Sequence, residues 1–117
     1  MGIHGEPGVR RGALEPADDV TDQIITALLQ DLPHDKGDRV DILVNSLGAT
    51  PPEELYIICG RACALLEERG LVLRRAWVGE YATSLEMAGM SISLLRLDDQ
   101  LVRLIEAPAS SPILVRL

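Results

Sequence analysis

Hydrophobic positions repeat with two different periods along the 117 residues, and these periods predict the order of the elements. A spacing of three and four residues, typical of an amphipathic helix, occurs twice. The first apolar stripe runs from Val20 to Leu32, and the second comprises Leu55, Ile58, Cys59, Ala62, Leu65 and Leu66. Short apolar runs typical of strands occupy 40–44, 71–78 and 90–97. The chain therefore reads as loop, helix, strand, helix, strand, strand, helix and tail.

The second helix carries its own start and stop signals. Thr50 and Glu53 have the spacing of a capping box, in which the hydroxyl and the carboxylate each accept from a backbone N–H. Pro51 suits the first helical position, where its missing donor would have no partner. Gly70 is the residue expected in the left-handed conformation at the helix end.

The strands on either side of this helix predict a β-α-β unit. The run at 40–44 indicates a strand covered on both faces, and 71–78 should lie parallel to it through a right-handed crossover. The connection to 90–97 fits either a hairpin or a short helical turn. A last helix is expected to begin at 98–99, and 113–115 is a candidate edge strand.

Length and composition fit one α/β domain over residues 1–117, and a chain of this size buries roughly two-thirds of its unfolded surface. We predict a small mixed β-sheet of three to four strands with one β-α-β crossover and packed helices. The net charge of −7 argues against a nucleic-acid partner. No apolar run approaches the ~20 residues that span a bilayer, and no signal peptide is evident, so we expect a cytoplasmic protein without a membrane partner.

The two cysteines do not indicate a metal site. Cys59 and Cys63 lie four residues apart on the second predicted helix, without a second Cys or His pair at ligand spacing. We expect both to be reduced and packed, and we predict no metal ligand in this chain.

Three loops carry candidate chemistry. The loop at 45–50 follows a strand and precedes a helix, where backbone donors could meet an anion, although it lacks the second glycine and the lysine of a P-loop. A self-bonded turn is the competing interpretation. The loop at 83–86 has two hydroxyls near a glutamate but no histidine close in sequence, which favours turn chemistry. The Gly- and Pro-rich stretch 1–16 contains His4, whose imidazole could attack a carbonyl, and a mobile terminus is the alternative there.

Four motifs in sequence order resemble those of the dihydroxyacetone kinase family. They are GIHGEPG at 2–8, LVNSLGATP at 43–51, ELY at 54–56 and TSLEMAGMSI at 83–92. More narrowly, they are similar to the second half of the substrate-binding K subunit, and the resemblance extends to about Pro112.

The resemblance implies a covalent substrate site. In that family the histidine of the GIHGEPG motif binds dihydroxyacetone as a hemiaminal, which places this role on His4, with Gly2, Ile3, Gly5 and Glu6 as the substrate loop. It implies no cofactor on this chain, because ATP with Mg²⁺, or a phosphotransferase-system donor with bound ADP, belongs to a helical L domain or subunit. A homodimer is implied for the full protein.

The family's N-terminal half has no counterpart in these residues. That half holds a second Gly-rich motif with another histidine and the aspartate that handles the reacting hydroxyl. We therefore expect a fragment, a wrongly assigned start or a split gene, and no kinase activity from this chain alone. The alternatives are a non-catalytic dihydroxyacetone-binding sensor or coactivator and a truncated remnant.

Overall fold

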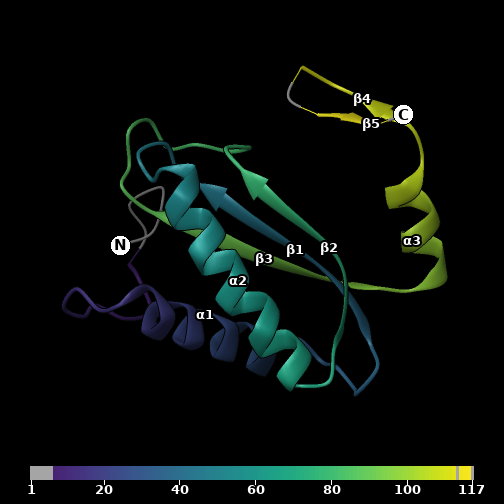
Figure 1. Cartoon of the computed structure of the whole chain (residues 1–117), viewed down its shortest axis with the longest axis horizontal. Coiled ribbons are helices and arrows are strands. Elements are labelled where there is room, and N and C mark those ends of the chain that lie inside the picture. The colour runs from purple at the N-terminus through teal and green to yellow at the C-terminus, as the bar shows by residue number, and fades with distance from the viewer. Residues whose placement is uncertain (1–6, 113, 117) are drawn as a thin grey trace.

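The computed structural model describes residues 7–112 and 114–116, which form three helices, a central sheet and a small hairpin (Figure 1). The elements in order are α1 (Ala17–Asp31), β1 (Arg39–Ser46), α2 (Pro52–Glu68), β2 (Val72–Gly79), β3 (Met90–Leu97), α3 (Asp99–Glu106), β4 (Ala109–Ser110) and β5 (Val115–Arg116). The central sheet has the order β2-β1-β3, with β2 parallel and β3 antiparallel to β1. This mixed three-stranded sheet confirms the predicted α/β fold.

The core lies between one face of the sheet and the helices α1 and α2 (Figure 1). Val40, Ile42 and Val44 of β1 point to this face and are fully buried. All six residues of the predicted α2 stripe are buried against them, together with Ile25 and Leu29 of α1. The apolar periodicity therefore identified the packed faces of both helices correctly.

The two ends of α2 differ from each other in how well the sequence predicted them. Gly70 has a φ of +82°, so the expected left-handed position is confirmed. The capping box is wrong, because Pro51 is the N-cap and no side chain caps the helix. The Thr50 hydroxyl instead donates to the carbonyl oxygen of Gly89 at 2.8 Å. A tertiary hydrogen bond has replaced the local one.

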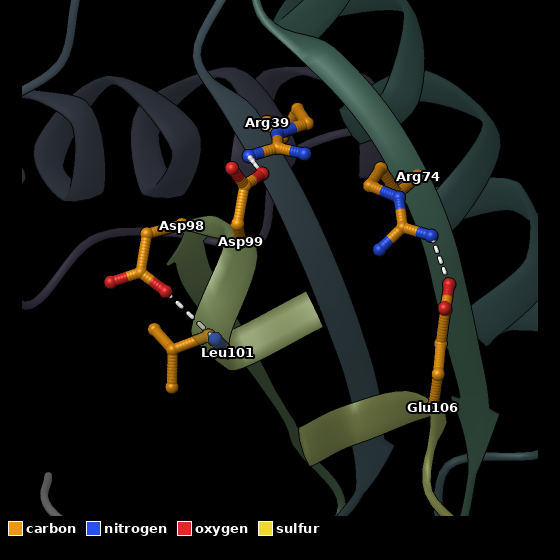
Figure 2. Close-up of polar contacts among 6 residues, drawn as sticks. All are labelled: Arg39, Arg74, Asp98, Asp99, Leu101 and Glu106. Carbon is orange, nitrogen blue, oxygen red and sulfur yellow. Dashed lines mark hydrogen bonds and ion pairs between the residues drawn. The ribbon is translucent and has the colours of Figure 1, made fainter. Parts of the chain in front are cut away.

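Ion pairs join the helices to their neighbours. On α2, Arg61 donates two hydrogen bonds of 2.7 Å to Asp22 of α1, and this contact lowers the pKa of the Asp22 carboxyl. Figure 2 shows that Arg39 of β1 pairs with Asp99 at the start of α3, and that Arg74 of β2 pairs with Glu106 at its end. These two pairs hold α3 across two neighbouring strands.

The C-terminal part departs from the expectation for 113–115. Its residues do not extend the central sheet: β5 pairs antiparallel with β4 in a separate hairpin, and Ile113 lies outside the described residues. The predicted start of α3 is confirmed, because the Asp98 carboxylate accepts from the Leu101 N–H at 2.7 Å (Figure 2). None of the α3 side chains is buried, so one face of the sheet is only partly covered.

No helix in the described ranges is long and apolar enough to cross a membrane.

Candidate functional site

Two loops meet at the carboxyl ends of β1 and β2, the edge at which α/β sheets usually bind ligands (Figure 1). The first loop, 47–51, joins β1 to α2, and the second, 80–89, joins β2 to β3. Because β3 pairs with β1 and not with β2, the second loop must cross the end of β1. Of the two connections expected from the sequence, the hairpin is therefore wrong, and in place of a helical segment the loop has a single turn in which the N–H of Met87 donates to the carbonyl of Ser84 at 3.1 Å.

Asn45 fixes the start of the crossing loop. Its side chain is 3% exposed, and its Oδ1 accepts from the backbone N–H groups of Tyr81 at 2.7 Å and Ala82 at 2.9 Å. Its Nδ2 donates to the carbonyl oxygen of Ala82 at 2.7 Å and to the Ser91 hydroxyl at 3.3 Å. One buried amide therefore joins β1, the crossing loop and β3.

Backbone hydrogen bonds then lock the two loops together. The N–H of Leu47 donates to the carbonyl of Gly89 at 3.0 Å, and that of Ala49 donates to the carbonyl of Met87 at 3.1 Å. In the other direction, the N–H of Ser84 donates to the carbonyl of Leu47 at 2.9 Å. Gly48 and Met87 form an isolated parallel bridge just beyond the end of the antiparallel β1–β3 ladder, so the two loops are joined outside the regular sheet.

The anion-binding interpretation of 45–50 does not fit this arrangement. The N–H groups of Leu47 and Ala49 are used by the second loop, and that of Gly48 donates to the Ser46 hydroxyl at 3.1 Å. Ser46 in turn donates to the carbonyl of Thr50 at 2.8 Å. A turn whose donors are already bonded is the interpretation that the geometry supports.

Gly48 is required by the close approach of the second loop. It has a φ of +132°, and a Cβ built on it would lie 2.1 Å from the carbonyl oxygen of Leu85, which is backbone and cannot swing away. Leu85 itself has a positive φ of 53° and a side chain that is 92% exposed. The sequence marked Gly48 only as part of a turn, because the contact depends on residues 37 positions further along the chain.

The loop pair offers little nucleophilic chemistry of its own. Ser84 has no histidine beside it: His34, which is the histidine among the described residues, lies before β1 at the opposite end of the sheet, with its Nδ1 2.8 Å from the carbonyl oxygen of Leu32. The turn interpretation of 83–86 agrees with this placement.

The predicted substrate loop lies outside the described residues. Gly2, Ile3, His4, Gly5 and Glu6 all belong to the first six residues, so their assignment to a covalent site stays a prediction.

Both cysteines lie on α2, within or against the hydrophobic core and away from the two loops. Cys59 is buried, and its sulfur lies 3.8 Å from that of Cys63, so both are free thiols. Burial, reinforced by Cys59, raises the pKa of the Cys63 thiol to about 12. A thiol that stays protonated at neutral pH is a poor nucleophile, which agrees with a packing role.

Known proteins resemble this chain both in sequence and in fold. The dihydroxyacetone-binding subunit DhaK of PTS-dependent dihydroxyacetone kinase 2 from Listeria innocua is 46% identical over 112 residues. A solved structure concerning the regulation of the dha operon of Lactococcus lactis superposes with a TM-score of 0.89 at 29% identity and covers 98% of this chain. The dihydroxyacetone kinase operon co-activator Dha-DhaQ superposes with a TM-score of 0.81 at 30% identity and covers 92% of this chain.

These similarities cover nearly all of this chain but only part of each relative. The aligned region is 96% of this chain and 34% of the Listeria protein, and it is 37% and 34% of the two solved chains. The chain thus spans about a third of the length of these relatives. The Dak1 domain family matches residues 1–113, and the chain belongs to this family, as its four motifs predicted.

Proposed function

We propose that this chain supplies the dihydroxyacetone-binding part of a dihydroxyacetone kinase, with His4 holding the substrate covalently. The observation that carries the proposal is the 46% identity to a subunit named for dihydroxyacetone binding. The GIHGEPG motif at 2–8 supplies the residue for the chemistry.

The chemistry requires a neutral imidazole and a carbonyl. A ring nitrogen of His4 adds to the carbonyl carbon of dihydroxyacetone, the carbonyl oxygen takes up a proton, and the ring loses its N–H proton. The product is a hemiaminal. It fixes a small triose in one orientation, which lowers the entropic barrier to transfer at a terminal hydroxyl. Glycerol lacks the carbonyl and cannot form this bond.

The substrate loop and its partners follow from the same proposal. The proposed substrate loop around His4 comprises Gly2, Ile3, Gly5 and Glu6, and glycines in such a loop would permit a close approach of backbone to the triose. The phosphoryl donor, ATP with Mg²⁺ or a phosphotransferase-system donor, is held by a helical partner domain. The chain spans 34% of the Listeria subunit, and we propose that transfer requires the rest of that fold. We also propose that the complete protein is a cytoplasmic homodimer.

The test uses a chimeric subunit, in which this chain replaces its matched segment of the Listeria protein. We expect the chimeric subunit to bind dihydroxyacetone and not glycerol in calorimetric titration, and we expect His4→Ala to lose the binding. Equal binding of dihydroxyacetone and glycerol by the chimera, or unchanged binding by the variant, would refute the role of His4.

A second function, a dihydroxyacetone-responsive coactivator, is favoured by the co-activator among the structural neighbours. Phosphoryl transfer separates the two. With the donor subunit present, a kinase subunit converts dihydroxyacetone to its phosphate, whereas a coactivator binds the ketone and leaves it unchanged.

A further inference from the structure

Two thiols on α2 lie in contact with each other, away from the two loops described above. The Sγ atoms of Cys59 and Cys63 are 3.8 Å apart, because residues four positions apart on a helix lie one turn above each other on the same side. Cys59 is 7% exposed and belongs to the hydrophobic core, whereas Cys63 is partly buried against that core. The pair therefore has one sulfur inside the core and one that solvent can reach.

The separation of the sulfurs suits a single atom that bonds both of them. Soft thiophilic atoms bind sulfur at about 2.3 Å, as zinc does, so one atom could bridge two sulfurs up to about 4.6 Å apart. At the observed separation of 3.8 Å, the angle between its two bonds would be about 110°, which is close to tetrahedral. The two thiols can therefore chelate one atom with little movement of α2.

The surroundings of the pair restrict the kind of atom that it can hold. Among the described residues, no group of three or more His, Cys, Asp or Glu side chains could hold a metal ion, so a metal that needs three or four protein ligands would lack some of them. Burial, together with Cys59 and Glu67, raises the pKa of the Cys63 thiol to about 12, so this thiol is protonated at neutral pH. The ligand must therefore need only two sulfurs, and it must carry away the thiol protons without leaving a charge.

A monosubstituted trivalent arsenical meets both conditions. In an oxide R–As=O, two thiols replace the oxygen: the two S–H bonds and the arsenic–oxygen bond break, two As–S bonds form, and the oxygen leaves as water with both thiol protons. Arsenic stays trivalent, so no oxidant or reductant is needed, and the product is uncharged. The third bond of arsenic carries the organic group R, which needs space on the solvent side of the pair.

Gly60 leaves this space open. It follows Cys59 directly in α2, and a Cβ added to it would meet nothing within 4 Å. Tyr56 precedes Cys63 by seven residues, so it lies on the same side of the helix, and it is 63% exposed. An organic group attached to the bridging atom would therefore lie over Gly60, near an exposed aromatic ring.

We propose that Cys59 and Cys63 form a binding site for a monosubstituted trivalent arsenical, which bridges the two sulfurs and places its organic group over Gly60. The site uses neither the two loops nor His4, and the proposal does not rest on the proposed function.

The first test measures the binding of phenylarsine oxide to the 117-residue chain after equilibration. Native mass spectrometry should show one adduct per chain, with one phenylarsenic unit gained and two hydrogens lost, and 2,3-dimercaptopropanol should remove it. Cys59→Ala and Cys63→Ala each leave one thiol. They should bind at least on the order of a hundredfold more weakly, because the second As–S bond can no longer form within one molecule.

A double variant controls for the number of thiols. Cys63→Ala combined with Ala64→Cys keeps two cysteines, but it places them five residues apart on different sides of α2. This variant should bind as weakly as the single-thiol variants. Wild-type affinity in the double variant, or in either single-thiol variant, would overturn the proposal.

The second test asks whether the folded helix makes the site. A ligand that binds the native chain more tightly than the unfolded chain raises the urea midpoint. We expect phenylarsine oxide to raise the midpoint of the wild type and to leave the midpoints of Cys59→Ala and Cys63→Ala unchanged. An unchanged or lower midpoint for the wild type would show that the native geometry contributes nothing to binding, and it would overturn the proposal.

Gly60→Leu tests the place of the organic group. The change favours the helix, so the variant should fold, but the leucine side chain would occupy the open space. We expect it to bind phenylarsine oxide more weakly than the wild type does, while its affinity for arsenous acid, which carries no organic group, stays the same. Unchanged affinity for phenylarsine oxide in the folded variant would overturn this placement. None of these tests involves dihydroxyacetone, so each can fail while the role of His4 stands.

Discussion

The hydrogen bonds of the buried Asn45 side chain give the most specific prediction about the two loops. Asn45→Ala removes the partner of two backbone N–H groups and one carbonyl, all belonging to Tyr81 and Ala82. A buried polar group left without a partner costs about 1–3 kcal/mol. Water can reach part of this loop and the three losses are not additive, so we expect the free energy of unfolding to fall by about 3 kcal/mol.

Urea unfolding followed by circular dichroism measures this change, provided that the slope of the transition is the same in both proteins. Ser91→Ala is the matched control: it deletes only the 3.3 Å contact to the Asn45 amide, and it should cost less than about 1 kcal/mol. Hydrogen exchange should accelerate at the amides of Tyr81 and Ala82 in Asn45→Ala. If Asn45→Ala lowered the free energy of unfolding by less than about 0.5 kcal/mol and left hydrogen exchange unchanged, the proposed role of Asn45 in fixing the loop would be refuted.

Three further predictions follow from single contacts. Gly48→Ala should destabilise the fold at least as strongly as Asn45→Ala, because its Cβ would collide with the Leu85 carbonyl; a urea midpoint equal to that of the wild type would contradict the interlocked loops. The lowered pKa of Asp22 means that its pair with Arg61 stabilises the chain above the pKa of the unfolded state and is lost as the pH falls through the folded pKa. Asp22→Asn should therefore lose less stability than the wild type between pH 7 and pH 3, and parallel pH profiles would show that the pair is not formed. The Cys63 thiol should react with Ellman's reagent far more slowly in the native chain than in urea, since its pKa is raised to about 12; equal rates would mean that the thiol is exposed.

Local patterns predicted the packed elements well. The α2 stripe and the limits of β3 came directly from apolar spacing, because burial against a single core imposes one period on each element. The capping-box prediction was wrong because a contact distant in sequence replaced the local hydrogen bond. Thr50 satisfies the local rule, but Gly89 lies within reach in the fold and takes its hydrogen bond.

The loop pair and the strand order could not be predicted in this way. Asn45 appears in the sequence as the polar end of a strand, and the three residues that its side chain bonds lie 36 to 46 positions away. The order β2-β1-β3 also depends on which edge of β1 accepts the third strand, and no local signal specifies it.

The family, by contrast, could be identified from four short motifs, because they combine backbone requirements with chemistry. Gly48 within the second motif is an example: its glycine is explained by the close contact with the backbone of Leu85. A residue in such a motif can therefore be required by backbone packing and not only by the reaction. The role of the first motif therefore needs a chemical test.

The most direct test of the account is the carbon-13 spectrum of the chimeric subunit with dihydroxyacetone labelled at its carbonyl carbon. The account predicts that the carbonyl resonance is replaced, on binding, by a resonance in the range of a tetrahedral carbon bonded to nitrogen and oxygen, and that His4→Ala shows only the free ketone and its hydrate. A tetrahedral adduct that persists in His4→Ala, or a bound ligand that keeps its carbonyl resonance in the wild type, would contradict it.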